Sequence, residues 1–246
     1  MKTIPLTEIP LIKPGDDLSE YILESLKNQE LALKNKDILV IAQSVVSKAE
    51  GNIVDLSSIE PSSRAKEIGK KIDEDPRRVK VILDQTQEIT RLGHVLITLT
   101  NHGFVCADAG VDDSNVEEGK VTILPENPDN NAEEIRKKIK KRTGKEIAVI
   151  ISDSWGRPFR LGAVGFAIGI AGITPLKHLK GEEDAYGGQL ETTKIAPVDA
   201  LAAAASLEMG ESHEKVPAVL IRNAPYESGE GSISELFRSE EMDLFR

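Results

Sequence analysis

Short apolar stretches rich in valine, isoleucine and leucine recur along the chain and predict that strands dominate the fold. Apolar runs of only a few residues with many β-branched side chains are typical of strands rather than of long helices. The predicted strands lie at 37–42, 79–83, 94–99, 103–107, 121–124, 147–151 and 217–221.

Two helices are predicted in the first third of the chain. Residues 18–26 carry apolar side chains at intervals of three and four, which is the spacing of one helix face. Residues 64–72 follow Ser62 and Ser63, and serine hydroxyls accept hydrogen bonds from the free N–H groups at a helix start. Both segments are therefore expected to be helical.

Two further helices have well-marked ends. Residues 132–141 follow Asn131, which has a glutamate three residues later, and they precede Gly144, where a helix is expected to stop. Residues 198–209 begin after a proline, end at Gly210 and include four consecutive alanines. Such small side chains suggest close packing against another element or another subunit.

The order of these segments favours an α+β (mixed α/β) fold with mixed sheets and flanking helices, because strands follow one another in places and alternate with helices in others. The glycine-rich run 161–176 is shorter than a membrane span and indicates backbone that neighbouring elements approach closely. We expect one catalytic unit over 1–246. Two interleaved subdomains are an option, with a boundary in the turn-rich segment 125–131.

Composition narrows the classes of function. The net charge of −10 argues against nonspecific nucleic-acid binding, which needs a surplus of lysine and arginine facing the phosphates. The basic stretch 136–145 lies in a predicted helix and is expected to be a solvated face. The single cysteine, Cys106, excludes an intrachain disulfide, and without a secretion signal the chain is expected to be cytoplasmic.

Two clusters of acidic and hydroxyl side chains each follow a predicted strand. Such oxygen ligands, without Cys or His neighbours, suit Mg²⁺ or Mn²⁺ rather than zinc or copper. Ligands often bind beyond strand ends, although the same residue types are common in turns that bind nothing. The clusters consist of Asp108, Asp112, Asp113 and Asn115, and of Asp153 and Ser154.

Charged residues near these clusters could complete a binding site. Arg157 and Arg160 follow the second cluster, and guanidinium beside metal-binding carboxylates is an arrangement that holds polyphosphate or a substrate carboxylate. Lys48 follows a strand in a segment without the Walker A spacing, and an ordinary surface lysine is the alternative. Glu211 follows a helix-ending glycine, where an exposed loop acid is the simpler interpretation.

Short motifs stand in a characteristic order along nearly the whole chain. They are Ile9-Pro10-Leu11-Ile12, Pro14-Gly15-Asp16-Asp17-Leu18, Val46-Ser47-Lys48-Ala49-Glu50-Gly51, Gly103-Phe104-Val105-Cys106-Ala107, Gly110-Val111-Asp112 with Ser114-Asn115, Leu124-Pro125 with Pro128-Asp129, Ser152-Asp153-Ser154 with Gly156-Arg157-Pro158, Ala167-Ile168-Gly169, and Met209-Gly210-Glu211. Any one motif is weak, but their number and order are specific. Together they resemble the coenzyme F420-0:L-glutamate ligase (F420-0:gamma-glutamyl ligase) family, from about Ile9 to Phe245.

The resemblance implies a reaction in which GTP phosphorylates the terminal carboxylate on the lactyl-phosphate arm of a deazaflavin precursor, F420-0. The amine of L-glutamate then attacks the acyl phosphate, giving an amide, GDP and phosphate. A carboxylate becomes a good electrophile only when phosphate makes its oxygen a leaving group, and the clustered negative charge needs cations. The resemblance also implies Mg²⁺ or Mn²⁺ at up to two sites, K⁺ as an option, and an intertwined homodimer.

Carried over residue by residue, the resemblance places one divalent metal on Asp112 and Asp153 and a second on Ser154 and Glu211. Our own hypothesis adds catalytic roles for Arg157 and Arg160, which would neutralise phosphate or substrate carboxylate. Lys48 is expected to face phosphate and Asn115 the nucleoside. The implied nucleotide pocket comprises Ile9, Pro10, Leu11, Ile12, Ser44, Lys48, Asn115, Met209, Gly210, Glu211, Ser212, His213, Glu214, Lys215 and Val216.

Several positions depart from the family pattern. Asp108 stands where asparagine is usual, Ser154 where threonine is usual, and Glu211 where glutamine is common. The larger and the smaller aromatic residue, Trp155 and Phe159, stand in the reverse of the order that is usual in the family. Ser154 and Glu211 keep an oxygen ligand, so metal binding is expected to persist. Asp108 adds a negative charge near the site and is expected to alter metal or substrate affinity.

Other functions stay open on the sequence alone. A metal-dependent phosphohydrolase would use Asp112 and Asp153 without an amine acceptor. A nucleotide- or coenzyme-binding module would keep the fold without turnover, although the presence of the acidic residues speaks against it. A related amino-acid ligase with a different acceptor is the closest variant of the leading interpretation.

Overall fold

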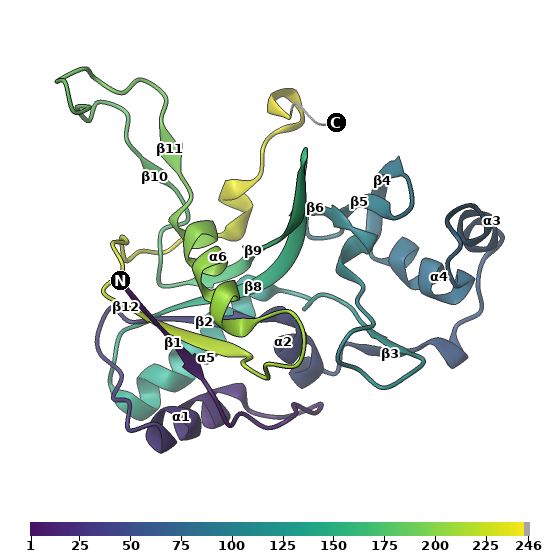
Figure 1. Cartoon of the computed structure of the whole chain (residues 1–246), viewed down its shortest axis with the longest axis horizontal. Coiled ribbons are helices and arrows are strands. Elements are labelled where there is room, and N and C mark those ends of the chain that lie inside the picture. The colour runs from purple at the N-terminus through teal and green to yellow at the C-terminus, as the bar shows by residue number, and fades with distance from the viewer. Residues whose placement is uncertain (244–246) are drawn as a thin grey trace.

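A five-stranded mixed sheet forms the centre of the main hydrophobic core in the computed structural model, which describes residues 1–243 (Figure 1). The spatial order is β1-β12-β2-β8-β9, with β2 and β8 parallel and the other neighbours antiparallel. This arrangement confirms the α+β prediction with mixed sheets. Phe245 lies outside the described residues. The strands are β1 (Lys2–Leu6), β2 (Ile38–Ala42), β8 (Ala148–Arg157), β9 (Arg160–Ala171) and β12 (Ala218–Arg222).

The two parallel strands are buried on both faces. β2 and the first half of β8 are nearly continuous runs of aliphatic side chains, as expected for strands with elements packed on each side. Their register pairs Ile41 with Ile151 and Ala42 with Ser152. The end of β2 therefore lies beside the middle of β8, where the polar residues of β8 begin.

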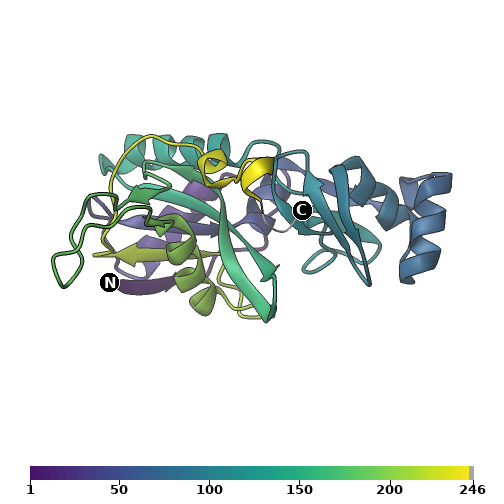
Figure 2. The ribbon, with the colours of Figure 1, turned by 90° about the horizontal axis from the view of Figure 1, so that it is seen from above.

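Helices cover both faces of the sheet (Figure 2). α5 (Pro128–Thr143) packs on one face of β8 and β9, and α1 (Leu18–Asn28) lies against α5 and β1. α6 (Pro197–Met209) packs on the other face of β8 and β9. A Cβ on Gly169 would lie 2.4 Å from the Pro128 carbonyl carbon, and one on Gly165 would lie 2.6 Å from the Ala202 oxygen. These glycines let both helices approach, as predicted for the glycine-rich run.

A second hydrophobic core lies beside the first, and its buried residues all lie between Leu56 and Val121. It joins two helices to a three-stranded sheet and a two-stranded pair. The elements are β3 (Ile53–Asp55), η1 (Leu56–Ser58), α3 (Ser63–Ile72), α4 (Pro76–Asp84), β4 (Thr86–Leu92), β5 (Leu96–Thr100), β6 (Val105–Ala107), η2 (Asp108–Gly110) and β7 (Lys120–Thr122).

Two peripheral segments complete the chain. β10 (Lys177–His178) pairs with β11 (Lys194–Ile195) at the base of an arm that projects from the molecule in Figure 1. The C-terminal segment carries η3 (Ile233–Leu236) and η4 (Glu240–Met242). Within residues 1–243, no helix has both the length and the apolar character needed to cross a bilayer.

The prediction of a strand at 79–83 is wrong, because this segment belongs to α4. Asp75 caps the helix by accepting a hydrogen bond from the Arg77 amide at 2.8 Å, and Pro76 occupies the first turn. Val79 and Ile82 are both fully buried, at the spacing of one helix face. A short apolar run cannot by itself distinguish a buried helix from a strand. The other six strand predictions correspond to β2, β5, β6, β7, β8 and β12.

All four predicted helices are present, with shifted boundaries. α5 begins earlier than predicted, because Asn127 rather than Asn131 is the cap and accepts from the Asn130 amide at 3.1 Å. α2 (Gln43–Glu50) was not predicted. β8 continues past residue 151, so Asp153 and Ser154 lie within a strand rather than after it. The reason is tertiary: β9 folds back as a hairpin and pairs with these polar residues.

Candidate active site

An open cleft of about 990 Å³ lies where the two cores meet, at the upper end of the roughly 300–1,000 Å³ usual for ligand sites. Its walls come from the loop before α1, the start of α2, the 107–115 segment, β8 and the chain after α6. The lining residues that the sequence placed in the nucleotide or metal sites are Ile9, Pro10, Leu11, Ile12, Ser44, Lys48, Asp112, Asn115, Asp153, Ser154, Met209, Gly210, Glu211, Ser212, His213, Lys215 and Val216.

Asp153 faces this cleft from β8 with its carboxylate held at both oxygens. Oδ1 accepts from the Ser154 amide at 2.8 Å and Oδ2 from Trp155 Nε1 at 2.7 Å. Burial by the surrounding protein is the main cause that raises the pKa of Asp153 to about 6. The charges of Asp112 and Glu211 contribute in the same direction, and the two hydrogen bonds oppose the rise in pKa. A partly desolvated carboxylate among like charges is stabilised in its ionised form by a cation.

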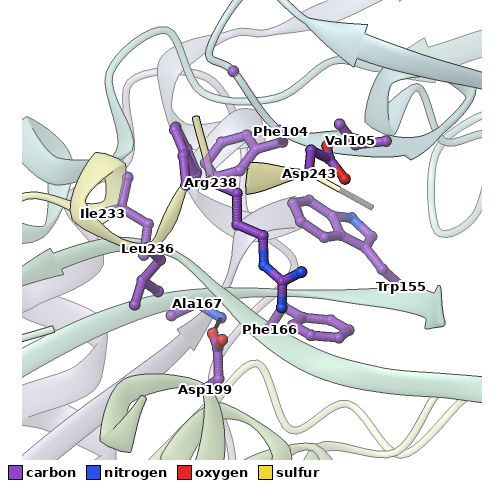
Figure 3. A pocket seen from close by; sticks show the side chains of 12 residues that line it. Phe104, Val105, Trp155, Phe166, Ala167, Asp199, Ile233, Leu236, Arg238 and Asp243 are labelled. Atoms are coloured by element: carbon purple, nitrogen blue, oxygen red, sulfur yellow. Dashed lines mark hydrogen bonds between the residues drawn. The ribbon is translucent and has the colours of Figure 1, made fainter. Parts of the chain in front are cut away.

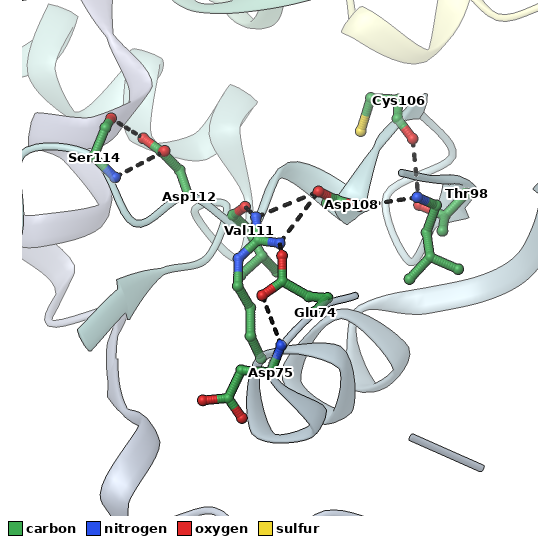
Figure 4. A network of polar contacts seen from close by, with 10 residues as sticks. Glu74, Asp75, Thr98, Cys106, Asp108, Val111, Asp112 and Ser114 are labelled. Carbon is green, nitrogen blue, oxygen red and sulfur yellow. Dashed lines mark hydrogen bonds and ion pairs between the residues drawn. The ribbon is translucent and has the colours of Figure 1, made fainter. Parts of the chain in front are cut away.

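Asp112 reaches the cleft from the other core. Its backbone forms an isolated bridge with Thr122, through hydrogen bonds of 3.1 and 2.7 Å, which ties it to the end of β7. The carboxylate accepts from the amide and the hydroxyl of Ser114 at 2.9 and 2.5 Å (Figure 4). Asp112 is thus oriented by its own turn and positioned by the second core.

Ser154 and Glu211, predicted to share a metal, lie in direct contact. The Ser154 hydroxyl donates to Glu211 Oε1 at 2.6 Å, although 57 residues separate them in the chain. The turn after α6 makes this possible, because Gly210 has a φ of +69° and a Cβ there would lie 2.2 Å from Glu214 Cδ. Glu214 accepts from the Ser212 amide at 2.8 Å and does not line the cleft among the described residues.

Lys48 and Asn115 also meet at the cleft. Lys48 Nζ, on α2, donates to the backbone oxygen of Asn115 at 2.6 Å. Burial lowers the pKa of Lys48, and the nearby charge of Asp112 acts in the opposite direction. The first residues of α2, including Ser44, open onto the same cleft. Helix N-termini present free N–H groups that favour anions, so this wall is suited to phosphate.

Asp108 lines the cleft, but its extra charge is compensated within the protein. Its carboxylate accepts from Arg78 at 3.3 Å and from the Leu96 amide at 3.0 Å. Arg78 also pairs with Glu74 at 2.9 Å and donates to the Val111 oxygen at 3.0 Å. Figure 4 shows this network directly beside the turn of Asp112. Arg78 therefore links α4 to the backbone that carries Asp112.

The donor set of the cleft fits a hard divalent ion that is shared with a phosphate. All four predicted ligands offer carboxylate or hydroxyl oxygens, as Mg²⁺ and Mn²⁺ prefer. No three Asp, Glu, His or Cys side chains in the described part of the chain are grouped closely enough to hold an ion by themselves. Mg²⁺ commonly takes only one or two carboxylates and completes its shell with water and phosphate oxygens, which suits the paired arrangement here.

The two predicted catalytic arginines lie outside the cleft. Arg157 and Arg160 pair across the turn of the β8–β9 hairpin, and Arg157 Nη2 donates to the Leu161 oxygen at 3.2 Å. Two residues with evident roles were not predicted. Trp155 donates a hydrogen bond to Asp153. Its position as the single tryptophan of the chain, close to an acidic residue, was a sequence signal that could have indicated this role. Arg78 lies 30 residues from Asp108 and carried no local signal.

Comparison with known proteins finds one matching family model and several named relatives. The family model described as F420-0:Gamma-glutamyl ligase matches residues 7–223. The chain is 49% identical to the Coenzyme F420:L-glutamate ligase of Methanothermobacter thermautotrophicus, over 97% of this chain and 96% of that protein. Proteins of the same name from Methanocaldococcus jannaschii and Archaeoglobus fulgidus are 48% and 42% identical, over 97% and 100% of this chain and 94% and 96% of theirs.

The raised pKa of Asp153 predicts a measurable pH dependence of stability in metal-free protein. Because the folded state binds this proton more tightly than the unfolded chain, stability falls as the pH rises from 3.8 toward about 6. The free energy of unfolding of Asp153→Asn, relative to the unaltered protein, is expected to increase by roughly 2 kcal/mol between pH 4 and pH 7. This is less than the full pKa shift would give, because solvent in the cleft screens the charges. Urea titrations in EDTA at several pH values measure this, and a pH-independent difference contradicts it.

Proposed function

The chain belongs to the F420-0:gamma-glutamyl ligase family and is a ligase, and from this premise we propose that it joins L-glutamate to the deazaflavin precursor F420-0 at the expense of GTP. The observation that carries the proposal is the cleft, where acidic, hydroxyl and lysine side chains converge from both cores. Relatives over nearly the whole chain carry the name Coenzyme F420:L-glutamate ligase. A related acid is the alternative acceptor.

The proposed chemistry balances in two steps. A carboxylate oxygen of the acceptor attacks the γ-phosphorus of GTP, so that GDP leaves and an acyl phosphate forms. The glutamate amine then attacks the acyl carbon, the carbon–oxygen bond to phosphate breaks, and the amine releases a proton as the amide forms. Both steps gather negative charge, so catalysis depends mainly on positioning and on compensating that charge.

The residues of the cleft suit these demands. Lys48 and the start of α2 would bind phosphates. Asn115 and the cleft-lining residues at 9–12, 209–213, 215 and 216 would complete the nucleotide pocket. Asp112 and Asp153 would hold one divalent ion, and Ser154 and Glu211 a second. Such ions, when bound, would supply positive charge directly beside these oxygen ligands. A K⁺ ion is a further proposal that rests on the family alone.

A homodimer is also part of the proposal. Phe159 and Leu161 at the tip of the β8–β9 hairpin are 94% and 98% exposed, and Tyr186 in the β10–β11 arm is fully exposed. Large apolar side chains on projecting segments are costly in water and are typical of surfaces that another subunit covers.

The decisive assay for the ligase supplies GTP, Mn²⁺ or Mg²⁺, L-glutamate and F420-0, and follows GDP and the glutamyl product by mass spectrometry. We expect a glutamyl mass increase that requires metal. Asp153→Asn is expected to lower the rate about a hundredfold, since it removes charge that would hold a metal ion at the phosphates. Asp113→Asn is the matched control, because this exposed neighbour of Asp112 does not line the cleft in the described structure.

Other outcomes of this assay point to different functions. GDP release at the same rate with and without glutamate and acceptor indicates a phosphohydrolase. Binding of GTP without GDP release indicates a nucleotide-binding module. Turnover only with a different acid in place of F420-0 indicates a related ligase.

The role proposed for the hairpin arginines is tested separately. If Arg157 neutralises phosphate or substrate carboxylate, Arg157→Ala lowers kcat/KM about tenfold and Arg157→Lys restores part of it, because lysine keeps the charge but not the planar fork. Arg160→Ala is expected to behave alike. Steady-state kinetics decide the matter, and unchanged activity in Arg157→Ala removes the arginine from the mechanism.

The homodimer is tested by size-exclusion chromatography with light scattering. The expected mass is twice the 26.8 kDa of one chain. Phe159→Ser with Leu161→Ser is expected to shift the equilibrium toward the monomer, whereas Leu92→Ser, a half-exposed leucine on β4, leaves it unchanged. A monomer mass for the unaltered protein contradicts the proposal.

A further inference from the structure

A second, smaller pocket lies beside the acidic cleft and has a different character. Its volume is about 220 Å³, and aromatic rings from β8, from β9, from the residue just before β6 and from the C-terminal segment line it (Figure 3). Whole ligands usually occupy about 300–1,000 Å³. A pocket of this size and composition suits one planar apolar part of a larger ligand.

The ring walls of the pocket are held in defined positions. Trp155 stacks on Phe166 with centroids 5.8 Å apart, and Phe104 meets Trp155 edge-on at 5.3 Å and Phe237 at 5.1 Å. Gly103, with a φ of +95°, leaves room for Phe237, since a Cβ there would lie 2.9 Å from the ring. Phe237 thereby packs the C-terminal segment against the other rings of the pocket.

Trp155 connects this pocket to the acidic cleft. It lines both cavities, and its indole N–H donates to Asp153 at 2.7 Å. A ring lying against Trp155 is therefore one side chain away from the proposed metal ligand. An acceptor held here would place its attached arm next to the phosphates in the cleft.

A cation stands over the same pocket. Figure 3 shows the side chain of Arg238 reaching across it toward Phe166. Arg238 is exposed, and within residues 1–243 its guanidinium forms neither a hydrogen bond nor an ion pair. The carboxylate of Asp199, on the opposite wall, accepts from the Ala167 amide at 3.1 Å. Arg238 is thus available to an anionic group, and arginine binds phosphate and carboxylate in bidentate fashion.

We propose that this aromatic pocket binds the fused ring system of the acceptor, with Arg238 contacting an anionic group of the same molecule. The inference rests on the proposed function, from which the acceptor takes its planar deazaflavin ring. Stacked aromatic side chains bind any π-face, whereas the polyphosphate of GTP matches the lysine and acidic residues of the cleft. Ring and nucleotide thus occupy separate cavities that meet at Trp155.

The single tryptophan makes the inference directly measurable. Because Trp155 is the only tryptophan in the chain, its fluorescence reports on the pocket without added labels. Titration of the full-length protein with F420-0, in the absence of glutamate, is expected to quench the emission. Phe166→Leu, which keeps an apolar side chain but removes the ring, and Arg238→Ala are each expected to weaken F420-0 binding about tenfold. Both variants are expected to leave GTP affinity unchanged.

Arg64→Ala is the matched control, because it removes another exposed arginine from α3 in the second core. It is expected to bind F420-0 as the unaltered protein does. Thermal unfolding checks each variant, and the exposed Arg238 keeps the test valid if Phe166→Leu unfolds. F420-0 affinities unchanged in Phe166→Leu and Arg238→Ala overturn the proposal. So does a loss of GTP affinity in these variants, which would place the nucleobase in the pocket.

Binding and turnover are measured separately, so the two proposals fail separately. Quenching by F420-0 that depends on Phe166 and Arg238, without any glutamyl product, supports the pocket assignment and contradicts the proposed ligase reaction. The opposite result is glutamyl product formation together with F420-0 binding that is unchanged in both variants. It supports the reaction and overturns the pocket assignment.

Discussion

The negative charge that Asp112, Asp153 and Glu211 bring into one partly desolvated cleft is the constraint on which the site depends. Burial and mutual repulsion raise the pKa of Asp153 to about 6, so the protein without ligands pays a cost for this cluster. Hydrogen bonds from Ser154 and Trp155 orient the Asp153 carboxylate, and strand β8 of the central sheet carries it. A bound cation, as proposed for the divalent ions, would offset this repulsion.

Each core supplies a different part of the site. The central sheet carries Asp153 and Ser154 on β8, beside the end of β2 and the start of α2. The second core supplies Asp112 and Asn115, held by the bridge to Thr122 and by Arg78. The cleft lies between them, so small movements of one core relative to the other would change the spacing of the acids.

The elements that the sequence predicted correctly are those with a clear period or clear ends. The helix at 64–72 had its serine cap, and the buried runs at 37–42 and 147–151 became β2 and β8. The strand predicted at 79–83 failed because five apolar residues fit either a buried strand or a helix, and the cap at Asp75 decided for the helix. β9 was missed as a strand because its glycines reflect contacts with α5 and α6 rather than strand propensity.

The sequence by itself determined the fold class, the family and most of the residues that line the cleft, because oxygen ligands, turn residues and motif order are local properties of the chain. Only the tertiary structure decided which of them meet: Ser154 with Glu211, Lys48 with Asn115, and Arg78 with Asp108. It also put Arg157 and Arg160 at a hairpin tip and assembled four aromatic rings into a pocket. Such contacts join residues far apart in the chain, and they depend on strand register and helix packing that no local pattern encodes.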